Sequence, residues 1–311
     1  MIGYAGLIIV LILVLIVVSW RFSGYVILPE NKDIQTMFLE EENKGNIIIE
    51  DFEKISKSDF SITTDDGLTL SGQWLYPKKP SRKVVIFCHG FGVNRVGSIK
   101  YIKPYLRRGY NAIIYDNRNA GNSEKRFTTM GFAEKNDLKK VLDYAYQVLG
   151  SECFAGTHGE SMGGATVLLH ACIDNRVRFV VADCAYADLT KQLTYRLKVE
   201  YHLPPFPVIY LTSLMTKLRA GFYFENVSPM REISRENGLE RIPVMFAHGK
   251  EDKYILPKAS VEMFEIKKGY KQLYIADNAK HAESIWVDAN KYNNQVEKLL
   301  DVAESHHGIN R

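Results

Sequence analysis

Residues 155–164 read AGTHGESMGG, and this stretch decides the fold. It predicts a short buried strand, a tight turn that carries one serine between glycines, and a helix over residues 165–172. Glycines on both sides of Ser161 permit a strained turn in which bulkier residues would clash with the strand and the helix. The turn lifts the serine hydroxyl above the end of the strand, where a base can reach it. Gly-x-Ser-x-Gly in this setting is typical of a nucleophile elbow.

An activated serine also needs donors for the oxygen that becomes negative during the reaction. Residues 83–88 (KVVIFC) form an apolar run that predicts a buried parallel strand, and HGFG follows it. This turn is expected to bring the backbone N–H of Phe91 close to the elbow. Together with the N–H of Met162, it makes the predicted oxyanion hole.

The base and the acid are expected downstream of the serine. Two further apolar runs, residues 243–247 and 272–275, predict strands, and polar turns follow each of them. The first turn contains Asp252 and the second contains His281. The chain order Ser161, Asp252, His281 predicts a triad in which His281 takes the serine proton and Asp252 orients the imidazole.

Two other carboxylates are alternatives to Asp252 as the acid of this triad. Glu251 is adjacent to Asp252, and Asp183 follows another predicted strand, residues 179–183. We expect Glu251 to be solvated and Asp183 to orient a loop.

Polar residues in the neighbouring turns are expected to have structural roles. His89 is expected to hold the oxyanion loop, and His158 is expected to be a core residue. Asp116 and Arg118 are expected to organise the loop after their strand through a salt bridge with each other.

These motifs resemble the serine α/β-hydrolases, and within them the bacterial esterase branch described through serine aminopeptidase and acyl-CoA thioesterase-like domains. The resemblance extends roughly from residue 60 to the C-terminal helix, and it implies an ester or acyl substrate. Members commonly carry Gly and His where this chain has Asn119 and Ala120, so the substrate preference of the family does not carry over at that loop. Further matching pieces are residues 64–70 (TDDGLTL), Asp116-x-Arg118-x-x-Gly121-x-Ser123, and residues 129–131 with Glu134 and Asp137.

The alternation of apolar runs with helical patterns predicts an α/β fold with a mostly parallel central sheet and helices on both faces. The resemblance to the serine α/β-hydrolases implies that this sheet belongs to an α/β-hydrolase fold with a small helical cap insertion. We predict a transmembrane anchor over residues 1–21, a connector over 22–57 and a hydrolase domain over 58–305. The cap insertion is predicted at about 187–238. Helices are predicted at residues 96–108, 133–149, 161–173, 257–267 and 288–302.

The anchor is predicted from residues 1–20, which carry no charged side chain. Twenty helical residues are about 30 Å long, enough to cross the hydrocarbon core of a bilayer. The absence of Lys and Arg before the apolar run, and the poor cleavage site around Trp20, favour an uncleaved anchor over a signal peptide. A single-pass membrane protein is therefore predicted. Arg21 and Lys32 favour a cytoplasmic catalytic domain only weakly, so the side of the membrane stays open.

Composition excludes several other classes. A net charge of +4, from 40 basic and 36 acidic residues, indicates no nucleic-acid partner. The four cysteines fit no zinc spacing and are expected to be buried free thiols, so no metal is predicted. The triad chemistry requires no cofactor. The cysteines are Cys88, Cys153, Cys172 and Cys184.

The leading functional prediction is a membrane-anchored serine hydrolase that cleaves carboxylic esters. Aromatic and aliphatic residues in the 187–238 insertion predict a small-molecule substrate with an apolar moiety. The alternative, which stays open, is that these residues only pack the cap against the body. A thioesterase, an acyltransferase or a peptidase would use the same triad, and these alternatives stay open. A third alternative is a non-catalytic binding protein tethered to the membrane, although such proteins usually lose a triad residue.

Overall fold

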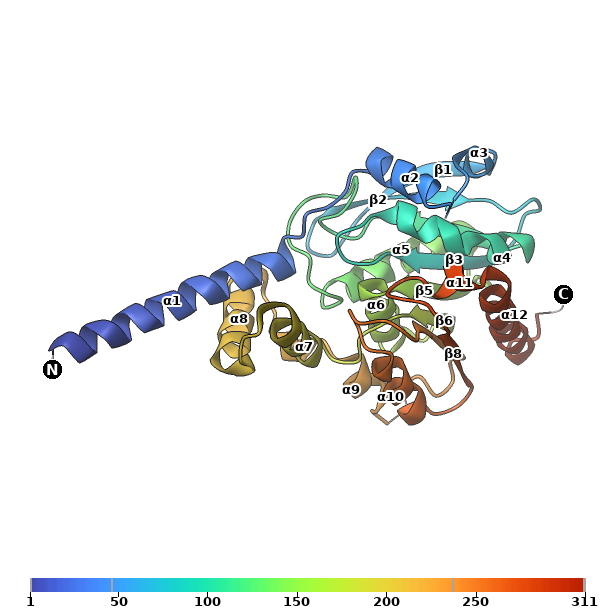
Figure 1. Ribbon diagram of the computed structural model, residues 1–311. Coiled ribbons are helices and arrows are strands. Elements are labelled where there is room, and N and C mark those ends of the chain that lie inside the picture. Colours follow the sequence, from blue (N-terminus) through green and yellow to red (C-terminus); the bar gives the residue numbers. More distant parts are fainter. Residues whose placement is uncertain (1, 46, 237, 310–311) are drawn as a thin grey trace.

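The computed structural model describes residues 2–45, 47–236 and 238–309, and it has an eight-stranded sheet between two layers of helices (Figure 1). The strand order is β1-β2-β4-β3-β5-β6-β7-β8. The pairs β1–β2 and β2–β4 are antiparallel, and the other pairs are parallel. This confirms the predicted α/β-hydrolase fold. The strands are β1 (Lys57–Thr63), β2 (Thr69–Leu75), β3 (Lys83–Cys88), β4 (Asn111–Tyr115), β5 (Phe154–Glu160), β6 (Val177–Asp183), β7 (Val244–Gly249) and β8 (Lys271–Ala276).

Helices cover both faces of the sheet because the central strands are apolar on both sides. In β3, Val84 and Ile86 pack against one helical layer, whereas Val85 and Phe87 pack against the other. One layer contains α4, α11 and α12, and the other contains α5, α6, α9 and α10. The helical segments are α1 (Ile2–Ile27), α2 (Ile34–Asn43), α3 (Ile49–Glu53), η1 (Arg95–Tyr101), α4 (Ile102–Arg107), α5 (Glu134–Leu149), α6 (Met162–Ala171), α7 (Leu189–Tyr201), α8 (Pro205–Ala220), η2 (Phe224–Asn226), α9 (Pro229–Ile233), α10 (Lys258–Ile266), α11 (Ser284–Val287) and α12 (Ala289–His306).

Helix α1 projects from the body of the molecule, and α8 lies beside the part of α1 that is nearest to the body (Figure 1). Its apolar part is Tyr4–Ile27, and the most apolar 18-residue window in it has a mean hydropathy of 2.7 and is almost entirely exposed. Ser23 and Ile27, near the end of the helix, are buried. It is long and apolar enough to cross a membrane, a property that it shares with signal sequences and with core helices of soluble proteins. The helix continues to Ile27, beyond the predicted anchor.

The predicted connector and cap also have defined structures. Helix α2 packs on η1, where Met37 is buried against Gly97. The segment predicted as a cap, residues 187–238, contains α7, α8, η2 and α9. Helices α7 and α8 lie on the side of the molecule from which α1 projects (Figure 1).

Candidate active site

The turn between β5 and α6 holds Ser161 in a strained backbone conformation, with φ of 56° and ψ of −116°. A non-glycine residue rarely adopts a positive φ, and such residues cluster at functional sites. Two glycines make the turn feasible. A Cβ at Gly159 would lie 2.1 Å from the carbonyl oxygen of Gly163, and a Cβ at Gly163 would lie 2.0 Å from that of Cys88. The helix therefore begins directly against the ends of β3 and β5, with the serine at its N-terminus.

The loops after β7 and β8 bring the other two predicted residues to this serine. His281 Nε2 lies 3.0 Å from Ser161 Oγ, and His281 Nδ1 lies 2.7 Å from Asp252 Oδ2. A carboxylate can only accept a hydrogen bond, so Nδ1 carries the proton and donates it to Asp252. This tautomer leaves the Nε2 lone pair free to accept a hydrogen bond from the serine hydroxyl.

The Asp252 carboxylate is buried and is held by four donors. Besides His281, it accepts hydrogen bonds from the backbone N–H groups of Tyr254 (2.8 Å) and Ile255 (2.9 Å). The Nε2 atom of buried His248 lies 3.2 Å from Asp252 Oδ2, the same oxygen atom that His281 contacts. Burial alone would raise the pKa of Asp252, but hydrogen bonds from His248 and His281 outweigh it and hold that pKa well below its usual range. Asp252 is therefore charged at neutral pH.

Sequence reasoning missed His248, which stands at the end of β7, four residues before Asp252. Its Nδ1 lies 2.7 Å from the hydroxyl of Ser260, and its Nε2 lies 2.9 Å from the carbonyl oxygen of Ile255. A carbonyl only accepts, so Nε2 carries the proton and points it at Ile255 and Asp252. The available signal was a histidine directly before the turn that supplies the acid.

The two alternative acids have other surroundings. Asp183 accepts hydrogen bonds from the hydroxyls of Ser284 (2.9 Å) and Tyr101 (3.2 Å), and burial together with Glu160 raises its pKa. Glu251 is exposed to solvent. Among the three carboxylates considered from the sequence, the structure brings Asp252 to the histidine.

The loop after β3 lies against the elbow, as the predicted oxyanion hole requires. A Cβ at Gly90 would lie 3.5 Å from the Cβ of Ser161. The ring of His89 fixes this loop, because its Nε2 accepts a hydrogen bond from the N–H of Asn117 (2.9 Å) and its Nδ1 donates to the Gly90 carbonyl (2.8 Å). The structural role expected for His89 agrees with this geometry.

The two predicted oxyanion donors are the backbone N–H groups of Phe91 and Met162. Met162 is the first residue of α6, where N–H groups have no acceptor within the helix. Among the residues that the structure describes, neither of the two amides donates to a protein acceptor. Both therefore remain available to an oxygen atom of a substrate.

The predicted salt bridge between Asp116 and Arg118 is wrong. Asp116 instead accepts hydrogen bonds from the N–H of Arg95 (2.8 Å) and from its guanidinium (3.0 Å). Arg118 pairs with Asp137 on α5 (2.6 Å) and with Asp66 (3.0 Å). The two residues are close in sequence, but each finds partners in segments that only the tertiary fold brings near.

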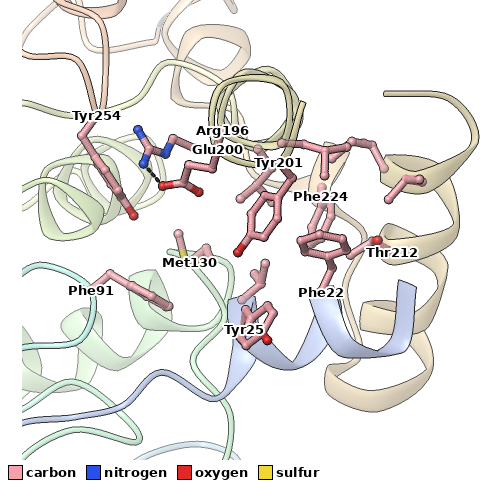
Figure 2. Close-up of a pocket in the computed structure, with 15 residues that line it drawn as sticks. Phe22, Tyr25, Phe91, Met130, Arg196, Glu200, Tyr201, Thr212, Phe224 and Tyr254 are labelled. Carbon is pink, nitrogen blue, oxygen red and sulfur yellow. Dashed lines mark ion pairs between the residues drawn. The ribbon is translucent and has the colours of Figure 1, made fainter. Parts of the chain in front are cut away.

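A cavity of about 140 Å³ lies between α1, α7 and α8 (Figure 2). At one end lie Phe91 and Tyr254, whose ring centroid is 4.9 Å from that of His281. At the other end lie Phe22 and Tyr25, which belong to α1. Sequence reasoning expected the cap to form an apolar pocket, but it did not expect α1 to take part.

In the part of the chain that the structure describes, Cys184, Asp252 and His281 form a group of side chains that could hold a metal ion, with ligand atoms within 4.8 Å of one another. Burial raises the pKa of the Cys184 thiol well above its usual value, so the thiolate needed for metal binding is disfavoured. The Nδ1 atom of His281 already donates to Asp252. These observations favour a hydrogen bond between His281 and Asp252 over binding of a metal ion by the three side chains.

Comparison with known proteins identifies relatives of this chain. Residues 83–207 match a family described as "alpha/beta hydrolase fold". The chain is 35% identical over 294 residues to YqkD of Bacillus subtilis, an uncharacterized protein, and the match covers 94% of each chain. It is 28% identical over 148 residues to thiohydrolase aneE of Aspergillus aculeatus, a match that covers 45% of each chain. Its structure matches an esterase of Pyrococcus furiosus with a TM-score of 0.64 and 24% identity, covering 83% of this chain and 94% of the esterase.

Proposed function

The chain belongs to the α/β-hydrolase family, and from this premise we propose that it is a serine hydrolase that cleaves carboxylic esters. Family membership supports hydrolase activity in general. One observation carries the narrower proposal. Ser161, His281 and Asp252 form a continuous chain of hydrogen bonds of 3.0 and 2.7 Å, with the serine held in a strained turn.

The proposed reaction begins with attack of Ser161 Oγ on the carbonyl carbon of the ester. His281 Nε2 takes the hydroxyl proton as the new C–O bond forms, and the negative charge moves onto the carbonyl oxygen. The N–H groups of Phe91 and Met162 stabilise that oxygen. Removal of one such donor in comparable sites costs about 2.7–4 kcal/mol of transition-state stabilisation.

The tetrahedral intermediate then collapses, the bond to the alcohol oxygen breaks, and His281 gives its proton to that oxygen. The acyl group stays on Ser161 as an ester. Water attacks this acyl-enzyme while His281 again takes the proton, and the carboxylic acid leaves as the serine hydroxyl is restored. Throughout, the Asp252 carboxylate stabilises the positively charged imidazole.

The cavity beside the site supports a substrate with an apolar moiety, because aromatic and aliphatic side chains line most of it. A thioesterase is the second candidate, since the relative in Aspergillus aculeatus is a thiohydrolase. The length and hydropathy of α1 support an uncleaved membrane anchor.

Labelling with a fluorophosphonate probe tests the proposal, because this reagent reacts only with an activated serine. We expect the full-length protein to be labelled and to hydrolyse p-nitrophenyl butyrate. Ser161→Ala should lose the label, and its kcat should fall by a factor of the order of 10⁶. Ser305→Ala, which changes an exposed serine on α12, serves as the matched control.

Failure of the intact protein to react with the probe and to hydrolyse the ester would reject the serine-hydrolase proposal. Comparison of butyrate esters with butyryl thioesters then decides between the two candidates, because both substrates form the same acyl-enzyme. An esterase should have the higher kcat/KM for the oxygen ester.

A further inference from the structure

The last two turns of α1 form a wall of the cavity beside the active site. Phe22, Tyr25 and Val26 line it from α1, and the other lining residues include Leu197 on α7 and Ile209 on α8. Phe22 contacts the ring of Tyr201 on α7 edge-on, with a distance of 4.7 Å between the ring centroids. The apolar helix is therefore part of the site as well as a projection from the molecule.

Polar contacts hold this wall in place. The hydroxyl of Thr216 on α8 is 3.0 Å from that of Ser23, and both residues are buried. Arg219 donates a hydrogen bond of 2.8 Å to the carbonyl oxygen of Trp20. At the C-terminal end of α1, the N–H of Thr128 donates a hydrogen bond of 3.0 Å to the carbonyl oxygen of Ile27. The position of α1 relative to the hydrolase body is thus fixed over about its last two turns, from Trp20 to Ile27.

The cavity runs from the reacting groups toward the apolar helix. Its inner end lies at Phe91 and Tyr254, next to the proposed oxyanion donor and to His281. Its outer end lies at Phe22 and Tyr25 (Figure 2), from which α1 continues as exposed Leu, Ile and Val toward the N-terminus. An apolar chain that leaves the reacting carbonyl through this cavity would emerge beside α1.

Helix α8 carries a second apolar surface on the same side of the molecule. Phe206, Tyr210, Leu214 and Leu218 follow one another at intervals of four residues and are 74%, 63%, 39% and 70% exposed. An interval of four places side chains on one face of a helix, although the turn at Phe206 departs from helical geometry. We name these four residues the α8 stripe.

Residues next to the α8 stripe are typical of the lipid headgroup region. Arg219 lies 4.4 Å from the ring centroid of Trp20, and Lys217 is exposed one turn before the helix end. Tryptophan and basic residues concentrate where membrane-spanning helices leave the hydrocarbon core. A helix with an exposed apolar face and flanking basic residues suits the interface of a bilayer.

We propose that the cavity between α1, α7 and α8 binds the hydrocarbon chain of a long-chain ester that enters from the bilayer, with the α8 stripe resting on the membrane surface. This inference rests on the proposed function for the identity of the reacting group. It adds a source for the substrate, a site for its chain, and a role for α1 as a wall of that site.

A pair of substitutions in α1 tests the cavity. Val26→Trp places a large ring in the cavity, whereas Val17→Trp makes the same change at an exposed position of the same helix. We expect Val26→Trp to lower kcat/KM for p-nitrophenyl laurate about tenfold or more relative to kcat/KM for p-nitrophenyl butyrate. Exclusion of two methylene groups from a buried site already costs that factor. Val17→Trp should leave both values unchanged.

The same comparison is made in α7, so that the result does not depend on one variant folding well. Leu193→Trp fills the cavity, and Val199→Trp changes an exposed position. Equal losses for the butyrate and laurate esters, or no loss for either ester in both cavity variants, would overturn the proposed chain site.

The bilayer as the source of the ester needs its own comparison. The laurate ester is supplied either in equimolar vesicles of phosphatidylcholine and phosphatidylglycerol or as a soluble cyclodextrin complex. The double variant Phe206→Gln and Leu218→Gln should lower the rate with vesicles about tenfold relative to the rate with the complex. The matched control is Val148→Gln with Ile173→Gln, which removes two exposed apolar residues of the body. Equal rates from both sources in all proteins would overturn entry from the bilayer.

Failure of the proposed function is recognised separately. If the intact protein hydrolyses neither ester, binding of a fluorescent dodecanoyl chain to Ser161→Ala protein measures the cavity directly. Loss of binding when Val26→Trp is added to Ser161→Ala, but not when Val17→Trp is added, supports the chain site even if the protein hydrolyses neither ester. Equal binding in all three proteins overturns it.

Discussion

Two buried aspartates lie at the carboxyl ends of neighbouring strands, Asp183 as the last residue of β6 and Asp252 in the turn after β7, and their partners distinguish them. Asp252 faces His281 and accepts two backbone N–H groups, whereas Asp183 accepts the hydroxyls of Ser284 and Tyr101. Backbone donors fix the position of the Asp252 carboxylate, because they do not rotate as side chains do. The imidazole it orients is consequently fixed as well.

Substitution of each aspartate by asparagine tests this difference. Asp252→Asn removes the charge and can present N–H to His281, which favours the wrong tautomer, so kcat should fall about 10⁴-fold with little change in KM. Asp183→Asn should lower kcat less than about tenfold, because the Asp183 carboxylate bonds to Tyr101 and Ser284. Its contact with Ser161 is made by its backbone carbonyl, which the substitution keeps. Steady-state kinetics with p-nitrophenyl butyrate measures both. The reverse order of effects would assign the acid to Asp183.

The local sequence singled out Ser161 and His281, which the structure places within hydrogen-bonding distance, because the turns that carry them have distinctive neighbours. It left Asp252 less certain, since each of the three candidate acids follows a strand or a turn with similar composition. The partners of Asp116 and the contact between His248 and Asp252 were out of reach. These contacts depend on how side chains turn after each strand, which no short pattern of residues encodes.

At the scale of elements, the nucleophile turn depends on the close approach of α6 to two strands. The helix begins where the carbonyl groups of β3 end, and Gly163 is the residue at the contact. There is no space for a methyl group at this position. The strain at Ser161 is sustained by this packing, since a helix displaced outward would permit a relaxed turn.

Gly163→Ala should therefore lower both stability and activity. The added Cβ would lie 2.0 Å from the carbonyl oxygen of Cys88, so the helix or the strand must move. We expect a loss of about 1–3 kcal/mol in the free energy of unfolding, as for other overpacked sites, and a fall in kcat. Gly6→Ala is the control, because nothing lies within 4 Å of a Cβ there. An unchanged denaturation midpoint and kcat for Gly163→Ala would contradict the packing argument.

The central strands and most helices were predictable to within a few residues from their apolar patterns. The helix predicted over residues 96–108 is instead a 3₁₀ segment followed by the short helix α4. Pro104 has no N–H and is tolerated only in the first turn of an α-helix, which explains why α4 begins just before it. The helix was predicted at the right location, but the structure has a 3₁₀ helix and a short α-helix there instead of one continuous α-helix.

At the scale of the whole molecule, the contact between α1 and α8 joins segments almost 200 residues apart. The sequence predicted an apolar helix and an apolar cap. Hydropathy indicates that a segment is removed from water, but it does not identify the segment that packs against it. Ser19, Ser23 and Ile27 are buried at intervals of four and form the packed face of α1. To predict that face, Ser19 and Ser23 would have to be interpreted as helix-contact residues, at the end of the predicted anchor and just beyond it.

His158 joins three elements of the core and makes stability depend on pH. Its Nδ1 lies 3.1 Å from the hydroxyl of Tyr105 on α4, and its Nε2 lies 3.1 Å from that of Tyr292 on α12. Burial, and secondarily the charge of Lys100, lowers the pKa of His158 to about 3. An unfolded histidine has a pKa of about 6.5. Between these values the unfolded chain binds a proton that the folded protein excludes.

The free energy of unfolding should therefore fall as pH decreases below about 6.5, with His158 contributing up to about 1.4 kcal/mol per pH unit, and this contribution is fully present above that pH. His158→Phe should be less stable at neutral pH, because two buried hydroxyls lose a partner at about 1–3 kcal/mol each. It should also have a smaller slope between about pH 6 and pH 4, since the titrating group is gone. Urea denaturation at several pH values measures both effects, with His306→Phe as the control for loss of one histidine. A slope in His158→Phe equal to that of the unaltered protein would show that the core histidine does not govern acid sensitivity.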